Sequence, residues 1–167
     1  QTWHDFEAVF DMPGNMYELW INGGRRGAFP YKDTGGAFNR LLLNNTGTVN
    51  VNAGTMLMQS GGTSTGTFNL AAGAKIEYRN GNHTLNNVTT SGAGTLQIST
   101  ENVGADALVT INGGTHTTAF VLSGSVLTGT SHTFQGLATW SGGTITGAAT
   151  ASTTFANDLT ITGPNSK

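Results

Sequence analysis

The chain of 167 residues contains no cysteine, only three prolines and few charged residues. Without cysteine it forms neither a disulfide framework nor a thiolate metal site. Its seven Lys and Arg residues do not supply the clustered positive face of a nucleic-acid-binding protein, so we expect no nucleic-acid partner. Charged residues make up 10% of the chain, against a usual figure of about 25%. Such a composition is not typical of an ordinary globular surface.

Long apolar runs are also missing. No run approaches the roughly 20 residues needed to cross a bilayer, so we expect no membrane insertion by this chain. The sequence does not start with the positively charged and apolar segments of an export signal, and we interpret it as a mature or excised segment. The net charge of −2 and the regular spacing of apolar residues predict a folded protein and not a disordered one.

What the chain has in abundance is a repeated pattern rich in Gly, Thr and Asn. "GTVNVNAGTMLMQSGGTST" (47–65) aligns without a gap on the segment that follows it, "GTFNLAAGAKIEYRNGNHT" (66–84), which places Leu57 on Ile76. A third unit, "GTLQI" (94–98), starts later than a constant period would place it and predicts an insertion in one coil. Later, "VLTG" (126–129) is followed by "TITG" at 144–147 and again at 160–163.

Short alternating apolar runs bounded by Gly and Asn are strand signals, and a repeat of this length is too short for helical solenoid units. We therefore predict an all-β fold, a parallel β-helix (β-solenoid) of six or seven coils of about 16–20 residues with glycines at the corners. A β-sandwich is the alternative, because it also has many short strands, but it needs no such self-match. The residues predicted to point inward are Val49, Val51, Leu57, Phe68, Leu70, Ile76, Leu85, Leu96, Ile98, Val109, Ile111, Phe120, Leu122, Phe134, Ile145, Leu159 and Ile161.

The composition changes near residue 40. Eight of the 14 aromatic residues and nine of the 16 charged residues lie in 1–40, so we expect this segment to be distinct from a repeat region at 41–167. An open first coil exposes unpaired backbone and apolar core, and 1–40 is interpreted as a β cap or a degenerate first coil. The alternative is a carbohydrate-contacting lobe, whose candidate contact residues are Trp3, Tyr17, Trp20 and Tyr31.

The segment "NNTGTVNVNAGTMLMQSGGTSTGTFNLAAGAKIEYRNGNHTLNNVTTSGAGTLQI" (44–98) resembles the repeat regions of bacterial autotransporter passengers and filamentous-haemagglutinin-like adhesins. "HTFQGLATWSGGTITG" (132–147) looks like another unit of the same kind. The likeness covers about 36–163. It implies a right-handed parallel β-helix, exported to the cell surface or beyond, that acts as a stalk or an adhesive surface. It brings no catalytic residues and no cofactor.

Residues with catalytic or metal-binding chemistry are few. His83, His116 and His132 recur in Thr-flanked strands, which suggests a metal-binding or pH-sensitive ladder; the interpretation we favour is that they are exposed strand residues. Glu101 and Asp106 are the nearest pair of carboxylates for acid/base catalysis of the glycosidase type. No two acidic residues of the repeat region share a predicted strand, so we expect a protein that is not an enzyme.

Threonines form one further pattern. Thr-x-Thr recurs along the repeat region, and rows of Thr on a flat solenoid face are a feature of ice-binding proteins. The spacing is regular only toward the end of the chain, and the shape of Thr favours strands in any case. The Thr residues that we name as candidate ligand contacts are Thr144, Thr146, Thr160 and Thr162.

Three functions follow from these patterns. The main hypothesis is a structural or adhesive segment at the bacterial cell surface or outside the cell, which contacts glycans or a host or neighbouring cell. The second is an extracellular filament subunit that stacks through its open coil ends, because an uncapped coil offers a pairing edge. The third is a carbohydrate-active β-helix enzyme or a phage-tail-like depolymerase.

Overall fold

The computed structural model describes a chain built from β-strands, and its contacts divide it into two compact units, Gln1–Asn39 and Arg40–Lys167. This boundary is close to the change of composition at residue 40. The residues that the structure describes are 6–11, 16–21, 24–30, 45–100 and 106–163.

The first unit holds a three-stranded antiparallel sheet. Its strands are β1 (Phe6–Asp11), β2 (Met16–Ile21) and β3 (Gly24–Pro30), in the order β1-β2-β3. The expected role of this unit as a cap on the repeat region stays a prediction.

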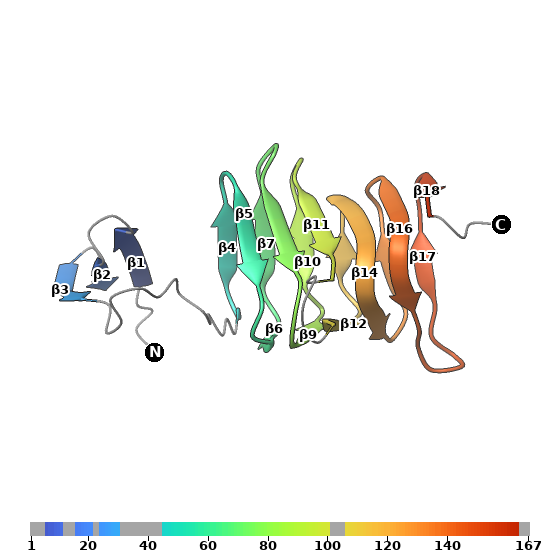
Figure 1. Cartoon of the computed structure of the whole chain (residues 1–167), viewed down its shortest axis with the longest axis horizontal. Coiled ribbons are helices and arrows are strands. Elements are labelled where there is room, and N and C mark those ends of the chain that lie inside the picture. The colour runs from blue at the N-terminus through green and yellow to red at the C-terminus, as the bar shows by residue number, and fades with distance from the viewer. Residues whose placement is uncertain (1–5, 12–15, 22–23, 31–44, 101–105, 164–167) are drawn as a thin grey trace. The chain divides into compact units, whose positions relative to one another are not determined.

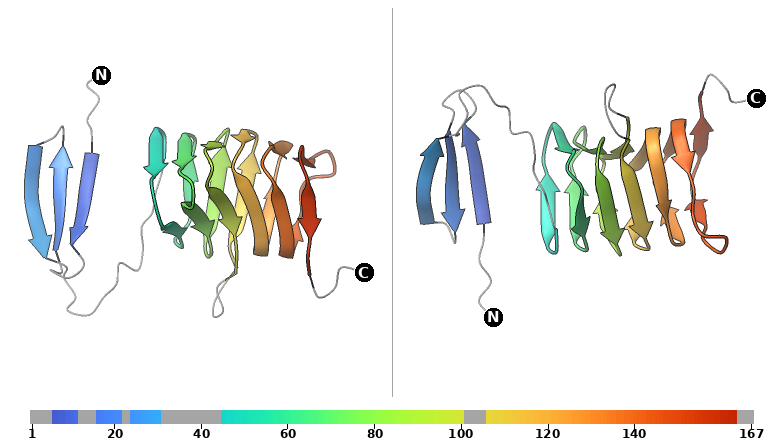
Figure 2. Two further views of the ribbon diagram at one scale, coloured as in Figure 1. Left: turned by 90° about the horizontal axis from the view of Figure 1, so that it is seen from above. Right: turned by 60° about the horizontal axis from the view of Figure 1, so that its bottom comes forward.

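The second unit is a parallel β-solenoid, as the sequence predicted (Figures 1 and 2). Six strands of its first sheet pair in parallel, one strand for each passage of the chain, so five turns separate the first from the last. The sequence predicted six or seven coils. In order of pairing from the N-terminal end, the strands are β4 (Thr48–Val51), β7 (Thr67–Leu70), β10 (Thr89–Ser91), β13 (Thr115–His116), β15 (His132–Phe134) and β17 (Thr153–Phe155).

Two further faces complete each coil. In the later coils a single long strand serves both faces: β14 (Ala119–Gly129) pairs through its first part with β11 and through its last part with β12. The register between β14 and its next neighbour, β16 (Ala138–Ile145), is irregular where the strand bends. The other strands of these faces are β5 (Thr55–Met58), β8 (Lys75–Tyr78), β11 (Thr95–Ile98) and β18 (Leu159–Ile161) on the second, and β6 (Gly62–Ser64), β9 (Asn82–Asn86) and β12 (Leu108–Asn112) on the third.

The strand register confirms part of the predicted alignment and corrects the rest. Strands β4 and β7 pair in the predicted register, which stacks Val49 on Phe68. The corner between β7 and β8, at 71–74, is longer by a single residue than the corner between β4 and β5, at 52–54. Leu57 therefore pairs with Glu77 on the outer face, and Met56 takes the place predicted for Leu57 beside Ile76.

The third repeat unit was also misplaced. "GTLQI" forms β11 and pairs with β8, whereas the neighbour of β7 in the third coil is β10. The coils also differ in length. The coil that leads from β13 to β15 is short, since Thr133 lies beside Thr115. The coil that leads from β10 to β13 is much longer, since Thr115 lies beside Thr89. Several coils are thus longer than expected, because the corners differ in length while the strands keep their register.

Inward-pointing side chains form one continuous core along the solenoid. Most of the predicted inward residues are buried, and Val49, Ile145 and Leu159 are partly buried against the core. Leu57 is half-buried on the outer face, so it was wrong as an inward position. Ile161 takes the inward position that the register assigns to it, although it is 56% exposed. The sequence prediction missed several buried apolar residues, namely Met58, Ala74, Tyr78, Val88, Ala107, Leu127 and Ala138.

Coil stacking also explains a pair of glycines. Gly47 and Gly66 immediately precede β4 and β7 and therefore occupy equivalent positions in successive coils. A Cβ atom at Gly66 would overlap the carbonyl oxygen of Gly47 and lie 2.8 Å from its nitrogen, whereas a Cβ atom at Gly47 would meet nothing within 4 Å. Glycine is therefore required where the Cβ position faces the backbone of another coil, as at Gly66, and not where it faces open space, as at Gly47.

We predict that Gly66→Ala destabilises the solenoid and that Gly47→Ala does not. The first change forces coils apart and should lower the free energy of unfolding by about 1–3 kcal/mol. The matched change at Gly47 should stay within about 0.5 kcal/mol. Urea unfolding of the two variants beside the wild type measures both values. Equal losses in the two variants would contradict this account of the coil contact.

Candidate functional site

The outer face of the first sheet carries an unbroken row of threonines. One Thr of each strand occupies the same register position, so the row crosses all six strands at the interstrand spacing of about 4.7–4.9 Å. Each of these residues is exposed or half-exposed. From the first coil to the last they are Thr48, Thr67, Thr89, Thr115, Thr133 and Thr154.

A second row runs beside the threonines, at the next outward position along the first strands. Asn69 donates from Nδ2 to Oδ1 of Asn50 at 2.9 Å, and Ser91 donates from Oγ to Oδ1 of Asn69 at 2.6 Å. These bonds hold the side chains of neighbouring coils in fixed positions. The six strands of this sheet contain no Asp, Glu, Lys or Arg. The face is therefore uncharged, regular and rich in hydroxyl and amide groups.

The threonines that the sequence named as ligand contacts lie elsewhere. Thr144 and Thr146 are exposed, and Thr144 pairs with Val126 on the third face. Thr160 lies in β18 beside Thr139, and the exposed Thr162 follows that strand. Because the strand register places Thr160 beside Thr139 and not beside Thr144, the regular sequence spacing does not bring these threonines into one row. Their role as ligand contacts stays a prediction.

Of the aromatic candidates of the first unit, the structure describes the backbone of two. Tyr17 and Trp20 lie in β2, where they pair with Phe10 and Glu7 of β1. Trp3 and Tyr31 lie outside the described residues. Their role in carbohydrate contact stays a prediction.

The histidines are buried, which overturns their interpretation as exposed strand residues. His83, His116 and His132 are 2%, 0% and 6% exposed. His83 is on the third face and the other two are on the first, so the three do not form a single ladder. In each case the histidine takes an inward position and the threonine after it points outward, because side chains alternate along a strand.

His116 lies at the centre of a buried polar cluster. Its Nδ1 is 3.2 Å from Oγ1 of Thr90, and that oxygen is 3.0 Å from Oγ1 of Thr118. Its Nε2 is buried and has no hydrogen-bond partner, and its ring packs against Phe134 at 5.2 Å. Burial, and to a lesser degree the charge of His132, lowers the pKa of His116 to about 4. His116 is therefore neutral near pH 7.

His132 has partners for both ring nitrogens. Nδ1 is 2.7 Å from the carbonyl oxygen of Thr130, and Nε2 is 3.2 Å from Oγ1 of Thr153. Burial lowers its pKa, and its backbone partners oppose that shift. Among the described residues, no group of three or more His, Cys, Asp or Glu side chains is placed to hold a metal ion.

A buried carboxylate that the sequence did not single out is Glu77. It lies on the outer face of β8, yet it is 3% exposed because Lys75 and Arg79 cover it, each with a nitrogen 2.9 Å from a carboxylate oxygen. Ser99 donates to the same carboxylate at 2.6 Å. Burial alone would raise the pKa of Glu77, but the hydrogen bonds from Ser99, Lys75 and Arg79 outweigh it and lower the pKa to about 2.

The two carboxylates that the sequence offered as a catalytic pair do not both lie among the described residues. Asp106 is exposed, and Glu101 lies outside them. The Glu77 carboxylate has two cations and a hydroxyl as its partners, an arrangement that neutralises a charge at a sheet surface. The burial of Glu77 is therefore explained by its neighbours on the second face of the solenoid.

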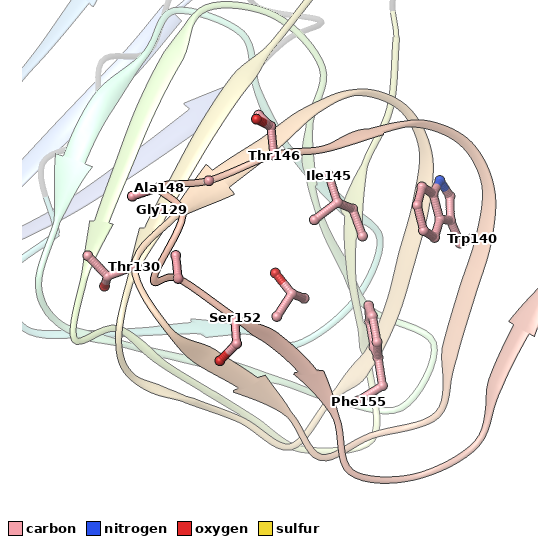
Figure 3. Close-up of a pocket in the computed structure, with 11 residues that line it drawn as sticks. Gly129, Thr130, Trp140, Ile145, Thr146, Ala148, Ser152 and Phe155 are labelled. Carbon is pink, nitrogen blue, oxygen red and sulfur yellow. The ribbon is translucent and has the colours of Figure 1, made fainter.

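A cavity of about 390 Å³ opens at the last coil (Figure 3). Trp140, Ile145 and Phe155 supply its apolar lining, and Thr130, Thr146, Ser152 and Thr153 supply hydroxyl groups. Figure 3 shows the apolar side chains Trp140, Ile145 and Phe155 on one side of this cavity, and all three pack against the core of the solenoid. Sequence reasoning missed this cavity, because its lining comes from three separate segments, 129–130, 140–148 and 151–155, that only the fold brings together.

Comparison of the chain with family models, with curated proteins and with solved structures gives no match. No helix among the described residues is long and apolar enough to span a membrane.

The buried histidine predicts an acid-sensitive solenoid. The unfolded chain protonates His116 near pH 6.5 and the folded protein only near pH 4, so stability is fully present above about pH 6.5 and falls as the pH drops toward 4. We expect His116→Phe, which keeps a ring against Phe134, to reduce this loss by about 2–3 kcal/mol. Unfolding in urea at a series of pH values between 4 and 7 measures it. An unchanged pH dependence in the variant would refute the assignment.

Glu77 predicts a second, separate pH range. Its lowered pKa means that its contribution to stability is present above about pH 4.5 and is lost as the pH falls toward 2. We expect Glu77→Gln to cost about 2 kcal/mol at pH 7, because two cations then lose their counterion, and to match the wild type near pH 2. Asp106→Asn, at an exposed carboxylate, is the control and should change stability by less than about 0.5 kcal/mol. Thermal or urea unfolding of the two variants and the wild type at pH 7 and near pH 2 measures these differences in stability.

Proposed function

We propose that this chain is a non-enzymatic structural segment of a secreted bacterial surface protein, a rigid β-solenoid that serves as a spacer and as a contact surface for glycans or a neighbouring cell. The observation that carries the proposal is the outer face of the first sheet, where six threonines follow one another in register beside hydrogen-bonded Asn and Ser side chains. Its location outside the cell is supported by the resemblance of 44–98 to exported repeat regions.

Stiffness supports the spacer role. Every coil between the first and the last is hydrogen-bonded to a coil on each side, and its core side chains pack on both neighbours. Bending the solenoid would break ladder bonds on one face and open the core beneath it, leaving backbone groups unpaired. Repeat proteins of this kind bear load through contacts between neighbouring units.

The chemistry of the face supports the contact role. Threonine hydroxyls both donate and accept hydrogen bonds, and Asn side chains do so through separate groups. Each contact is weak, but a row at a fixed spacing engages many groups of a polymeric ligand at once, which raises the overall affinity. A glycan, which presents hydroxyl groups at regular intervals, is the class of ligand that matches an uncharged face of this kind.

The test is binding to a glycan array and to cells. We expect Thr67→Arg with Thr115→Arg, two changes in the row that do not lie on adjacent strands, to weaken binding at least about tenfold by placing bulk and charge across it. The matched control is Thr84→Arg with Thr128→Arg, which alters the third face in the same way. Loss in both variants, or no binding by the wild type, would contradict the proposal for the first face.

A further inference from the structure

One column of inward side chains changes from apolar to polar along the first sheet. Its first two members are apolar, and its next two, Thr90 and His116, are polar. Both polar residues are fully inside the solenoid, at 1% and 0% exposure. In β15 and β17 the column continues with aromatic residues. In order its members are Val49, Phe68, Thr90, His116, Phe134 and Phe155.

A second histidine reaches the same part of the core. The ring of His132, in β15, meets the ring of Phe134 edge-on, with 5.4 Å between the ring centroids. His116 packs on the same phenyl ring at 5.2 Å. Phe134 also stacks on Phe120 at 3.9 Å and on Phe155 at 5.6 Å. The two imidazole rings therefore belong to one aromatic cluster that joins β13, β14, β15 and β17.

Among the residues that the structure describes, no carboxylate is placed to compensate a positive charge in this cluster. Strands β10, β12, β13, β14, β15 and β17 surround the two rings and contain no Asp, Glu, Lys or Arg. The titratable group that acts on His116 is His132, whose charge opposes protonation of His116. Asp106 and Asp158 are exposed, and Glu77 is paired with cations on the second face. An imidazolium in the cluster is thus a buried charge without a counterion, which is costly.

The two histidines differ in how they accommodate a proton. His132 has an acceptor at each ring nitrogen, the carbonyl oxygen of Thr130 for Nδ1 and Oγ1 of Thr153 for Nε2. His116 has Oγ1 of Thr90 at Nδ1, whereas its buried Nε2 has no hydrogen-bond partner. An imidazolium donates from both nitrogens. Protonated His116 would therefore leave one buried N–H without an acceptor, and it is the group that the fold cannot hold in its charged form.

The effect of such a charge is local, because each coil of a solenoid contacts only its neighbours. Repeat proteins can open over a stretch of units while other units stay folded. In β4 and β7 every inward residue is apolar, so acid introduces no charge there. The charge arises in β13 and β15, and the outward residues of these strands include Thr115 and Thr133 of the threonine row.

We propose that His116 and His132 form an acid switch that opens the solenoid from β13 to β17 while β4 and β7 stay folded. As the pH falls below about 6.5, the open stretch takes up protons that the folded cluster does not hold, and each such proton favours the open form by about tenfold per pH unit. Burial lowers the pKa of both histidines, which agrees with this direction. Opening separates Thr115, Thr133 and Thr154 from the rest of the row. This last consequence, the release of a ligand in acid, rests on the proposed function.

Hydrogen exchange of the full chain, without any ligand, tests the switch directly. The measured quantity is the protection factor of each strand, which corrects for the chemical rate of exchange at each pH. We expect protection in β13, β15 and β17 to fall at least about thirtyfold between pH 7 and pH 4.5, because the open form binds at least one proton more than the folded form. Protection in β4 and β7 should change less than about threefold.

Two variants remove the titrating ring at position 116. His116→Phe keeps a ring against Phe134, and His116→Gln keeps a group that can form a hydrogen bond with Thr90. We expect each of them to reduce the acid-induced loss of protection in β13 and β15 at least about tenfold. The matched control is His83→Phe, which removes the buried histidine of the third face. It should leave the loss in β13 and β15 as in the wild type.

Three results of the exchange measurement would overturn the switch. The first is protection in β13 and β15 that does not fall at pH 4.5, which would mean that the folded cluster tolerates the charge. The second is an equal loss in β4, β7 and β13, which would mean that acid unfolds the whole solenoid. The third is a loss that both variants at position 116 retain in full, or that His83→Phe abolishes.

Binding measured beside exchange separates the switch from the proposed function. For a glycan that the wild type binds at pH 7, we expect binding at pH 4.5 to be at least about tenfold weaker, and His116→Phe to bind alike at both pH values. Absence of binding at pH 7 would contradict the proposed function and leave the exchange result unaffected. Equal weakening in the wild type and in His116→Phe would overturn the regulation of the first face by His116.

Discussion

Parallel pairing between coils is the constraint on which the rest of the structure depends. Each strand finds its backbone partners in the previous and the next coil, so the register between coils decides which side chains stack. Identical outward residues then form rows, as the threonines of the first sheet do, and amides form hydrogen-bonded ladders such as the one between Asn86 and Asn112. The same close stacking leaves no room for a Cβ atom at Gly66. Surface chemistry, core composition and corner residues are therefore consequences of one interaction.

Stacking also determines where a polar residue is tolerated inside the solenoid. An inward polar group meets the equivalent residues of the coils on either side, so its hydrogen-bond partners must come from them. His116 finds Thr90 in the preceding coil, and Ser125 receives a hydrogen bond from the backbone N–H of Ala107 at 3.0 Å. The Nε2 atom of His116 is an exception, because no hydrogen-bonding group reaches it. A neutral imidazole is consistent with that position, since a charged ring there would lack any compensating group.

The sequence was informative about the strands and much less so about the corners. Alternation of apolar residues and the match of 47–65 on 66–84 were enough to predict a β-solenoid and the pairing of Val49 with Phe68. A single additional corner residue before β8 was enough to place Leu57 on the outside, because such a shift exchanges the two faces of a strand. The burial of His83 and His132 followed from the same alternation, because Leu85 and Phe134, which were predicted to point inward, lie two residues after them. Only His116, between two threonines, has no apolar residue two positions away that marks its inward side. Ile161 was assigned to the correct side, and only its place in the last coil leaves it exposed.

The outer faces of the solenoid offer a partner many weak contacts. Their backbone is paired and their side chains are polar, so a single contact gains only the small free energy of hydrogen bonds that replace bonds to water. Six threonines in register multiply such a contact along one ligand, and the row converts individually weak contacts into a useful affinity. The strength of lateral binding therefore depends on the number of coils, because each coil adds one threonine at the same register position.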